Sequence, residues 1–370
     1  MGILWALSDL HLSYAHNREE LTKLKAHPDD SLILAGDIGE TADHLHLAFS
    51  TVKPLFRHIW WIPGNHELYT LPHKHEEKPA KRGVEKYEEC VDIAKSYGIL
   101  TPEDDFEIWD PEEELPLSQK PALPHNPSLT HITRISRTTS SIGRLAMDPL
   151  AMKVASREPA SGTDSATNSR PTSSNDHTST KTRALICPIF TLYDYTFRPP
   201  EIPRSEALAW AREVGIEATD EHILHPDPYN TRDEWCHDLV KHHHSRLVAA
   251  RKRADEENLK LIIVNHWPLK EELAQLFSVP RFKLWCGTKL TKNWHREFGA
   301  AVVVTGHCHL RRTDWIDGTR FEEVSLGYPK QWAECRDRGM DVNDMLREIL
   351  PGPADAPESG NMATQWRRHG

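Results

Sequence analysis

Short apolar runs alternate with longer amphipathic stretches along most of the chain. Five of these runs are rich in apolar side chains such as Val, Ile and Trp, and most are closed by Gly or Asn, a pattern typical of buried β-strands. They cover residues 3–7, 31–35, 58–62, 259–264 and 300–305. Residues 81–97 and 232–257 instead carry apolar side chains at helical spacing. Alternating strands and helices predict an α/β layered fold.

Two segments lack this pattern. Residues from about 111 to 183 are dense in Ser, Thr, Pro, Asn and His, and they contain few aromatic residues. They therefore offer little apolar surface to offset the entropy of ordering, and we expect a disordered insertion there. Residues 351–370 are polar and contain Gly and Pro, so we expect a flexible tail. The folded part would then be a single domain, 1–350, interrupted by the insertion.

Composition indicates the size of the core and the compartment of the protein. A chain of 370 residues with 38% apolar content can bury a large core. Every apolar stretch is shorter than the roughly 18 residues of a membrane helix, and residues 1–10 lack the basic start and cleavage site of a secretory signal. The six Cys show no C-x-x-C pair, which agrees with a reducing compartment. We therefore expect a cytoplasmic protein that does not associate with membranes.

Charge argues against a nucleic-acid partner. The formal net charge is -10, whereas binding to phosphate backbones relies on clustered Lys and Arg. The densest basic run, 246–253, is interleaved with apolar residues on a helical pattern. We interpret it as the solvated face of a helix.

Polar blocks that contain metal-ligating side chains follow the five apolar runs. The blocks are Asp9-Leu10-His11, Gly36-Asp37, Gly64-Asn65-His66-Glu67, Asn265-His266 and Gly306-His307-Cys308-His309. In open α/β sheets, ligands usually bind where strands run out into loops. The first pair of ligands, Asp9 and His11, are two residues apart, as are His307 and His309. In extended chain such residues point to the same side, so each pair can face one pocket.

Together the blocks supply side chains suited to two metal ions: Asp9, His11, Asp37, Asn65, His266, His307 and His309. This set of carboxylate, imidazole and amide oxygen ligands suits Mn, Fe or Zn. It differs from the thiolate ligands of a structural zinc site. Asp37 can bridge two ions, and a pair of ions roughly 3.5 to 4 Å apart serves in-line displacement at phosphorus. We do not expect Cys308 to be a ligand, because it points away from its neighbours. The His run 242–244 is excluded too, since consecutive helical residues splay by about 100°.

The order D-x-H, G-D, G-N-H-E, N-H and G-H-x-H resembles the calcineurin-like metallophosphoesterases. The resemblance implies two mixed β-sheets packed face to face and flanked by α-helices. It also implies two divalent or trivalent metal ions, the first held by Asp9, His11, Asp37 and His309, and the second by Asp37, Asn65, His266 and His307. His66 would be the catalytic imidazole near the leaving-group oxygen.

An acidic neighbour would keep His66 protonated and oriented. Glu40 is the preferred candidate, because related phosphatases carry an acidic residue three positions after the bridging Asp. Glu67 is the alternative. The alternative for Glu40 is a purely structural role, as a carboxylate at the start of a helix.

Segments between the blocks narrow the resemblance to an actinobacterial branch of the family that includes a phosphopantetheinyl hydrolase. These segments are 101–104, 192–195, 225–229, 284–288 and 321–329. The implied activity is hydrolysis of a phosphate ester by in-line attack of a metal-bridging hydroxide, with 4′-phosphopantetheine released from an acyl or peptidyl carrier protein. The alternatives are a phosphodiesterase or phosphomonoesterase acting on nucleotides or other small phosphoesters. A DNA nuclease fits the acidic charge less well, and a metal-free scaffold fits the intact ligand set less well.

Overall fold

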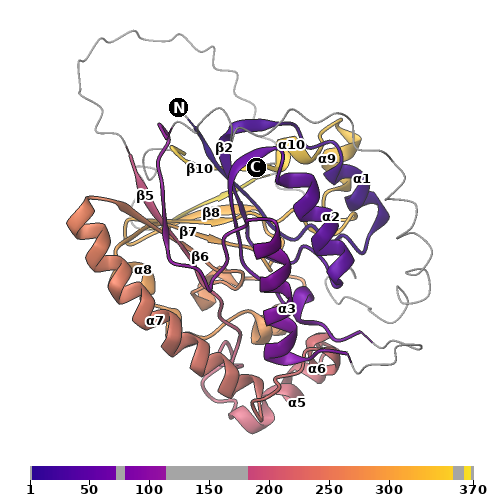
Figure 1. Ribbon diagram of the computed structural model, residues 1–370. Coiled ribbons are helices and arrows are strands. Elements are labelled where there is room, and N and C mark those ends of the chain that lie inside the picture. The colour runs from indigo at the N-terminus through magenta and orange to yellow at the C-terminus, as the bar shows by residue number, and fades with distance from the viewer. Residues whose placement is uncertain (1, 72–79, 114–181, 353–361, 368–370) are drawn as a thin grey trace, which may run out of the picture.

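The computed structural model describes residues 2–71, 80–113, 182–352 and 362–367, and the statements below refer to these. Two β-sheets lie at the centre of the molecule, and helices cover their outer faces (Figure 1). Among the described residues, no helix combines the length and the apolar character needed to cross a membrane.

The first sheet has four strands in the order β10-β1-β2-β3. The bounds of its strands are Leu4–Leu7 for β1, His27–Leu34 for β2, Phe56–Trp61 for β3 and Arg347–Leu350 for β10. Strands β1, β2 and β3 run parallel, and β10 pairs antiparallel with β1. The helices α1 (Ala15–Leu21), α2 (Ala42–Val52) and α3 (Gly83–Ser96) belong to this half of the chain.

The second sheet has seven strands in the order β11-β8-β9-β7-β6-β5-β4. Their bounds are Glu107–Trp109 for β4, Ala184–Pro188 for β5, Lys260–Val264 for β6, Ala300–Thr305 for β7, Arg312–Ile316 for β8, Thr319–Glu323 for β9 and Met362–Trp366 for β11. Strands β5, β6, β7 and β9 run parallel, and β4, β8 and β11 run antiparallel to their neighbours. Both sheets are therefore mixed, as expected.

Helices and turns complete the second half of the chain. The helices are α5 (Ala207–Arg212), α6 (Asp220–Ile223), α7 (Arg232–Glu257), α8 (Trp294–Glu297), α9 (Ala333–Asp337) and α10 (Val342–Met345). Short 3₁₀ turns lie at η1 (His66–Leu68), η4 (Arg204–Glu206), η5 (Glu271–Leu273), η6 (Pro280–Trp285) and η7 (Lys289–Thr291). Helices α3 and α7 cover the segments in which the apolar spacing predicts helices.

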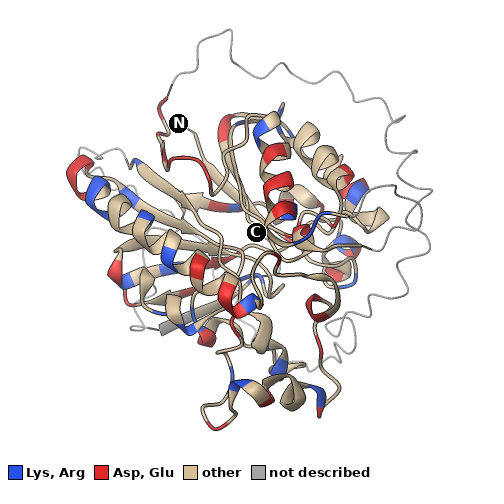
Figure 2. Cartoon of the chain, turned by 60° about the horizontal axis from the view of Figure 1, so that its bottom comes forward, with Lys and Arg blue, Asp and Glu red and all other residues tan. Residues whose placement is uncertain are grey.

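Helix α7 shows why the predicted boundaries agree with the structure. Its N-cap, Thr231, accepts a hydrogen bond from the backbone N–H of Glu234 at 3.1 Å, which satisfies one of the unpaired N–H groups of the first turn. The helix ends before Asn258, which has a φ of 53°, in the left-handed conformation that commonly closes helices. The helix carries both basic and acidic residues (Figure 2). Arg251 and Lys252 of the basic run lie on the solvated face of the helix, as expected, and pair with Asp255 and Glu256.

The core between the sheets follows from the two-residue period of the strands. On β6, Ile262 and Val264 belong to an apolar cluster that also contains residues of β1, β2 and β3, such as Ala6. Their neighbours Leu261 and Ile263 belong to a second cluster that includes one face of α7. Because β6 is buried on both faces, it appears in the sequence as a continuous apolar run.

The C-terminal segment differs from the expected flexible tail. Strand β11 pairs antiparallel with β8 along its whole length, from Met362 opposite Ile316 to Trp366 opposite Arg312. The pairing continues beyond the strand, where the backbone N–H of Arg367 donates to the carbonyl of Arg311 at 2.8 Å. Backbone hydrogen bonds at a sheet edge can hold a polar segment, so its composition does not reveal the strand.

The expected insertion falls almost wholly on residues 114–181, which lie outside the described residues, and it stays a prediction. The two strands that flank it, β4 and β5, are antiparallel neighbours, with Trp109 opposite Ala184. The ends of the segment are therefore held side by side.

Candidate metal centre

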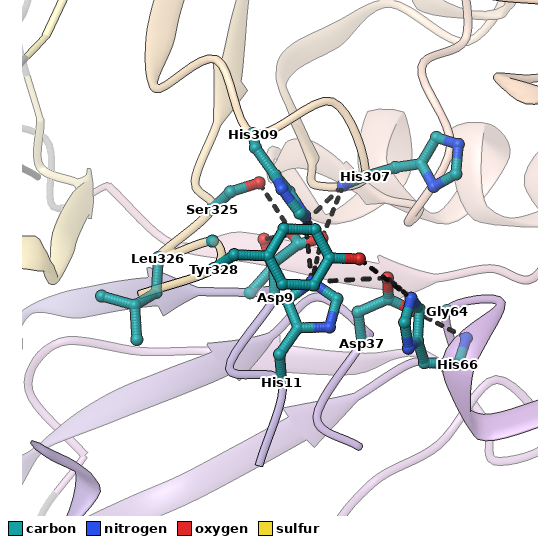
Figure 3. Close-up of polar contacts among 12 residues, drawn as sticks. Asp9, His11, Asp37, Gly64, His66, His307, His309, Ser325, Leu326 and Tyr328 are labelled. Carbon is teal, nitrogen blue, oxygen red and sulfur yellow. Dashed lines mark hydrogen bonds and ion pairs between the residues drawn. The ribbon is translucent and has the colours of Figure 1, made fainter. Parts of the chain in front are cut away.

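The predicted metal-ligating residues converge where the two sheets meet (Figure 3). They stand on the loops that follow β1, β2, β3, β6 and β7. The sheets are joined at this point, because the backbone N–H of Ser8, just after β1, donates to the carbonyl of Val324, just after β9, at 3.1 Å. Ligands from both ends of the chain therefore meet in one cluster.

The first group consists of Asp9, His11, Asp37 and His309, whose ligand atoms all lie within 4.8 Å of one another. His309 Nε2 is 2.8 Å from Asp9 Oδ1 and 3.0 Å from His11 Nε2. Asp37 Oδ2 lies 4.0 Å from His11 Nε2. Ring nitrogens and carboxylate oxygens thus point at a common centre.

The second group shares Asp37 with the first. It contains Asp37, His266 and His307 within the same 4.8 Å limit. His266 Nε2 lies 3.4 Å from Asp37 Oδ1. The amide oxygen of Asn65 adds a further ligand atom, 3.1 Å from His307 Nδ1. The position of Asp37 between the two groups is the one expected of a bridging carboxylate.

The backbone reaches this arrangement differently from the extended chain that the sequence suggests. Asp9 and His11 have φ values of 54° and 43°, Asp37 has 54°, and His307 and His309 have 70° and 52°. These values lie in the left-handed region, which non-glycine residues rarely adopt. The i and i+2 side chains therefore converge through left-handed turns, and the expected extended geometry is wrong. Such strain is typical of functional sites, where the surrounding structure holds it.

Two glycines are needed for the ligand loops to approach each other. A Cβ on Gly64 would collide with the carboxylate of Asp37, and a Cβ on Gly306 would collide with that of Asp9. The Gly residues that open the third and fifth blocks therefore make room for the ligands of the neighbouring loops.

The donor set fits metal ions. His266 Nδ1 lies 2.8 Å from the carbonyl of Ala35, and His309 Nδ1 lies 2.7 Å from Oε1 of Gln331. When a ring donates its Nδ1–H to such a partner, Nε2 keeps its lone pair for a metal. His266 Nε2 is buried and has no hydrogen-bond partner among the described residues, which is unusual for a buried polar atom. A cation at this centre would satisfy it.

Electrostatics keep the carboxylates ionised. Burial by itself would raise the pKa values of Asp9 and Asp37, but the surrounding His side chains outweigh it and hold both values well below their usual range. The same attraction acts in reverse on His266. Burial would lower its pKa, yet Asp37 raises it to about 9. The cluster thus contains ionised carboxylates, which favour the binding of cations.

His66 lies beside these groups and is positioned by Glu40. Its Nδ1 is 3.2 Å from Glu40 Oε1, and its Nε2 is 3.8 Å from Asp37 Oδ2. Burial opposes the charged imidazolium, but the two carboxylates outweigh it and raise the pKa of His66 to about 10. The carboxylates therefore favour the charged imidazolium, and Nε2 faces the metal-ligating group Asp37.

Glu67, the alternative partner of His66, serves another purpose. Its carboxylate accepts hydrogen bonds from the backbone N–H groups of Asp37 at 3.0 Å, Ile38 at 2.6 Å and Gly64 at 2.7 Å. It therefore ties the second and third blocks together. Of the two acidic candidates, the structure places only Glu40 against the ring.

Several residues that support the site carry no signal in the sequence. Ser8 and Ser325 donate to Asp9 Oδ2 at 2.5 and 2.7 Å. Asp220 accepts from Asn65 Nδ2 at 3.0 Å, which turns the amide oxygen of Asn65 toward His307. Asp220 is 155 residues from Asn65 along the chain. Only the fold could bring this pair together.

Cys308 and the His run 242–244, which we did not expect to be ligands, belong to neither of the two metal-ligating groups found among the described residues. Cys308 is buried. In the His run, His243 accepts a hydrogen bond from the backbone N–H of Phe190 at 3.1 Å, and His244 pairs with Glu297. The run is thus divided between the core and the surface.

Two matches cover most of the chain. The chain is 32% identical over 358 residues to the acyl-carrier-protein phosphodiesterase PptH of Mycobacterium tuberculosis, a match that covers 96% of this chain and 85% of that protein. The crystal structure of the phosphopantetheinyl hydrolase PptH from the same organism has a TM-score of 0.68 to this fold at 31% identity, covering 96% of this chain and 98% of the other.

Two further matches cover only parts of the chain. An uncharacterized protein of Acanthamoeba polyphaga mimivirus, L509, is 39% identical over 80 residues, which is 19% of this chain and 29% of that protein. A family model for calcineurin-like phosphoesterases matches residues 3–143. The family model and the likeness to PptH confirm the expected family and its fold of two mixed sheets flanked by helices. The chain belongs to the calcineurin-like phosphoesterases and is a metal-dependent hydrolase of phosphoric esters.

Proposed function

We propose that the chain is a phosphodiesterase that releases 4′-phosphopantetheine from an acyl or peptidyl carrier protein. The observation that carries this proposal is the likeness to PptH over 96% of the chain, which includes both sheets. The two metal-ligating groups alone suit any phosphoester, so the substrate rests on this likeness.

Asp9, His11, Asp37 and His309 would hold the first ion, and Asp37, Asn65, His266 and His307 the second. Their oxygen and imidazole donors suit Mn, Fe or Zn. When bound, two such ions supply a nucleophile near neutral pH and neutralise charge on the phosphoryl group.

His66 would act as the general acid. Cleavage of an ester to a carrier-protein serine expels an alkoxide, a poor leaving group that needs a proton. The Nδ1 of His66 is held by Glu40, so Nε2 is the atom that can deliver that proton. Together with Asp37, Glu40 raises the pKa of His66, and its contact with Nδ1 orients the ring.

The alternative is a phosphodiesterase or phosphomonoesterase acting on nucleotides or other small phosphoesters, which would use the same groups. We also propose a cytoplasmic location without nucleic-acid or membrane partners. The six cysteines are free and buried, which suits a reducing compartment. On α7, Arg251, Lys252 and Arg253 each pair with an acidic side chain four residues further on, which leaves less free positive charge for a nucleic acid.

The test is hydrolysis by the purified protein supplied with Mn. Holo acyl carrier protein is followed by intact-mass spectrometry, beside a generic phosphodiester and a generic phosphomonoester. Loss of the phosphopantetheine mass, absent from an Asp37→Asn control, is the expected result. Cleavage of the small esters without any change in the carrier protein would contradict the proposed substrate and favour the alternative.

A further inference from the structure

The loop that follows β9 is fastened to the loop that carries Asp9. The backbone N–H of Leu326 donates to the carbonyl of Ser8 at 2.9 Å, and that of Gly327 donates to the carbonyl of Asp9 at 3.0 Å. The buried side chain of Asn17 donates to the carbonyl of Gly327 at 3.0 Å. The next residue, Tyr328, is therefore held in a fixed position relative to the metal-ligating groups.

Gln331 ties the same loop to a metal-ligating residue. Its Oε1 accepts from the backbone N–H of Tyr328 at 2.7 Å and lies 2.7 Å from His309 Nδ1. Gly327 has a φ of 84°, and a Cβ there would lie 2.7 Å from the same oxygen. One amide oxygen thus orients both His309 and the backbone of Tyr328.

The ring of Tyr328 packs against the first metal-ligating group. It stacks on the imidazole of His11, with centroids 4.2 Å apart and an interplanar angle of 19°, and it meets His309 edge-on at 4.8 Å. The phenol hydroxyl then points toward His66 and lies 3.4 Å from its Nε2 (Figure 3). The hydroxyl of Tyr328 and Nε2 of His66 therefore converge on one place beside the metal-ligating groups.

We infer that Tyr328 is a second catalytic residue, whose hydroxyl donates a hydrogen bond to the leaving-group oxygen of the bound ester. This inference rests on the proposed phosphoesterase function. As the oxygen of the attacking water bonds to phosphorus, the P–O bond to the leaving group breaks and its electron pair passes to the leaving oxygen, which takes a proton from His66 Nε2. The attacking water releases a proton to solvent, and solvent restores the proton of His66. Tyr328 keeps its own proton and stabilises the developing negative charge by hydrogen bonding. Its preorganised position means that little reorganisation is needed during the reaction.

The test is Tyr328→Phe, which removes the hydroxyl and keeps the stacked ring. The Mn-supplied variant is assayed for kcat and KM on aryl phosphodiesters of graded leaving-group pKa. We expect kcat to fall about 10- to 100-fold for the ester with the poorest leaving group, which is less than the loss caused by removing a main oxyanion donor. For the ester with the best leaving group, kcat should fall much less. The matched control is Tyr97→Phe, which removes a hydroxyl that contacts His46 on the surface and should leave both parameters unchanged.

Two further readouts separate a catalytic role from a structural one. Metal content should stay equal to that of the wild-type protein. In a His66→Ala background the additional effect of Tyr328→Phe should shrink, because two groups acting on one oxygen are not independent. An equal loss of kcat across the ester series, or loss of metal in Tyr328→Phe, would overturn the inference. A wild-type protein inactive on every ester would instead overturn the proposed function.

Discussion

Glu40 Oε1 lies 3.2 Å from His66 Nδ1, and this contact decides which nitrogen of the ring faces the metal-ligating groups. Glu40 stands just before α2, three residues after Asp37, so one short loop carries both the shared carboxylate and the partner of the imidazole. A carboxylate at this distance stabilises the imidazolium and fixes its orientation.

Glu40→Gln should slow the enzyme without removing its metals. The amide keeps the shape of the side chain but loses the charge that helps to raise the pKa of His66 to about 10. The pKa of His66 should therefore fall, and the alkaline limb of the kcat profile should move to lower pH. A pH–rate profile on an unactivated diester checks this, with Glu334→Gln on the exposed face of α9 as the control. An unshifted alkaline limb would contradict the assigned role of Glu40.

His66→Ala should retain both metals and slow esters with poor leaving groups by about 10²- to 10⁴-fold, as loss of a general acid does. Esters with good leaving groups need less protonation and should slow less. Steady-state kinetics on the two ester classes, together with metal analysis, measure the difference. Equal slowing of both classes would mean that His66 has an electrostatic or structural role instead.

Asp37→Asn should remove activity and at least one metal ion together. A neutral amide bridges two cations far less well than a carboxylate, and Asp37 is the only member common to the two groups that the described residues form. Metal content by elemental analysis, compared with wild-type protein loaded in the same way, tests the assignment. Two ions retained in the variant would show that Asp37 does not bridge.

Deletion of residues 116–181, with a short Gly/Ser connection, should preserve metal binding and hydrolysis. The proposed ligands lie outside the segment, and its ends are held together by the pairing of β4 with β5 and by an ion pair of 3.2 Å between Arg183 and Asp110. The assay compares a carrier protein with a small ester. Selective loss of carrier hydrolysis would assign the segment a role in substrate binding, and failure to fold would contradict the single-domain prediction.

Arg367→Met tests whether the C-terminal segment stabilises the fold. The largely buried Arg367 guanidinium reaches the carbonyls of Glu323 and Arg312 and lies 3.5 Å from the buried carboxylate of Glu322. Because Glu322 keeps Arg347 and Arg320 as partners, we expect a loss of about 1–3 kcal/mol in the free energy of unfolding, not the larger cost of stranding a buried charge.

The control for Arg367→Met is Arg338→Met, which removes an exposed pair with Glu334. Such pairs contribute about 0–1 kcal/mol. Denaturant unfolding measures both variants. Equal effects would show that β11 and Arg367 contribute little to the stability of the second sheet.

The sequence by itself determined the central strands and the candidate ligands of this protein. Strands buried on both faces, such as β6 and β7, carry apolar residues at most positions, so they appear as nearly continuous apolar runs. The ligands follow strand ends directly, and the identity of a ligand is a property of the side chain itself. Helix α7 could be predicted equally well, because its apolar spacing and its N-cap at Thr231 lie within one short stretch of sequence.

Only the tertiary structure decided how these parts meet. The left-handed backbone at Asp9 and His307 replaced the expected extended chain, because the loops must turn sharply between two sheets. The choice of Glu40 over Glu67, and the placement of Tyr328 against His66, depend on contacts between loops distant in sequence. Strand β11 is held by backbone hydrogen bonds, which carry no side-chain signal. Residue types and local periodicity are encoded along the chain, whereas contacts across long separations exist only once the core has formed.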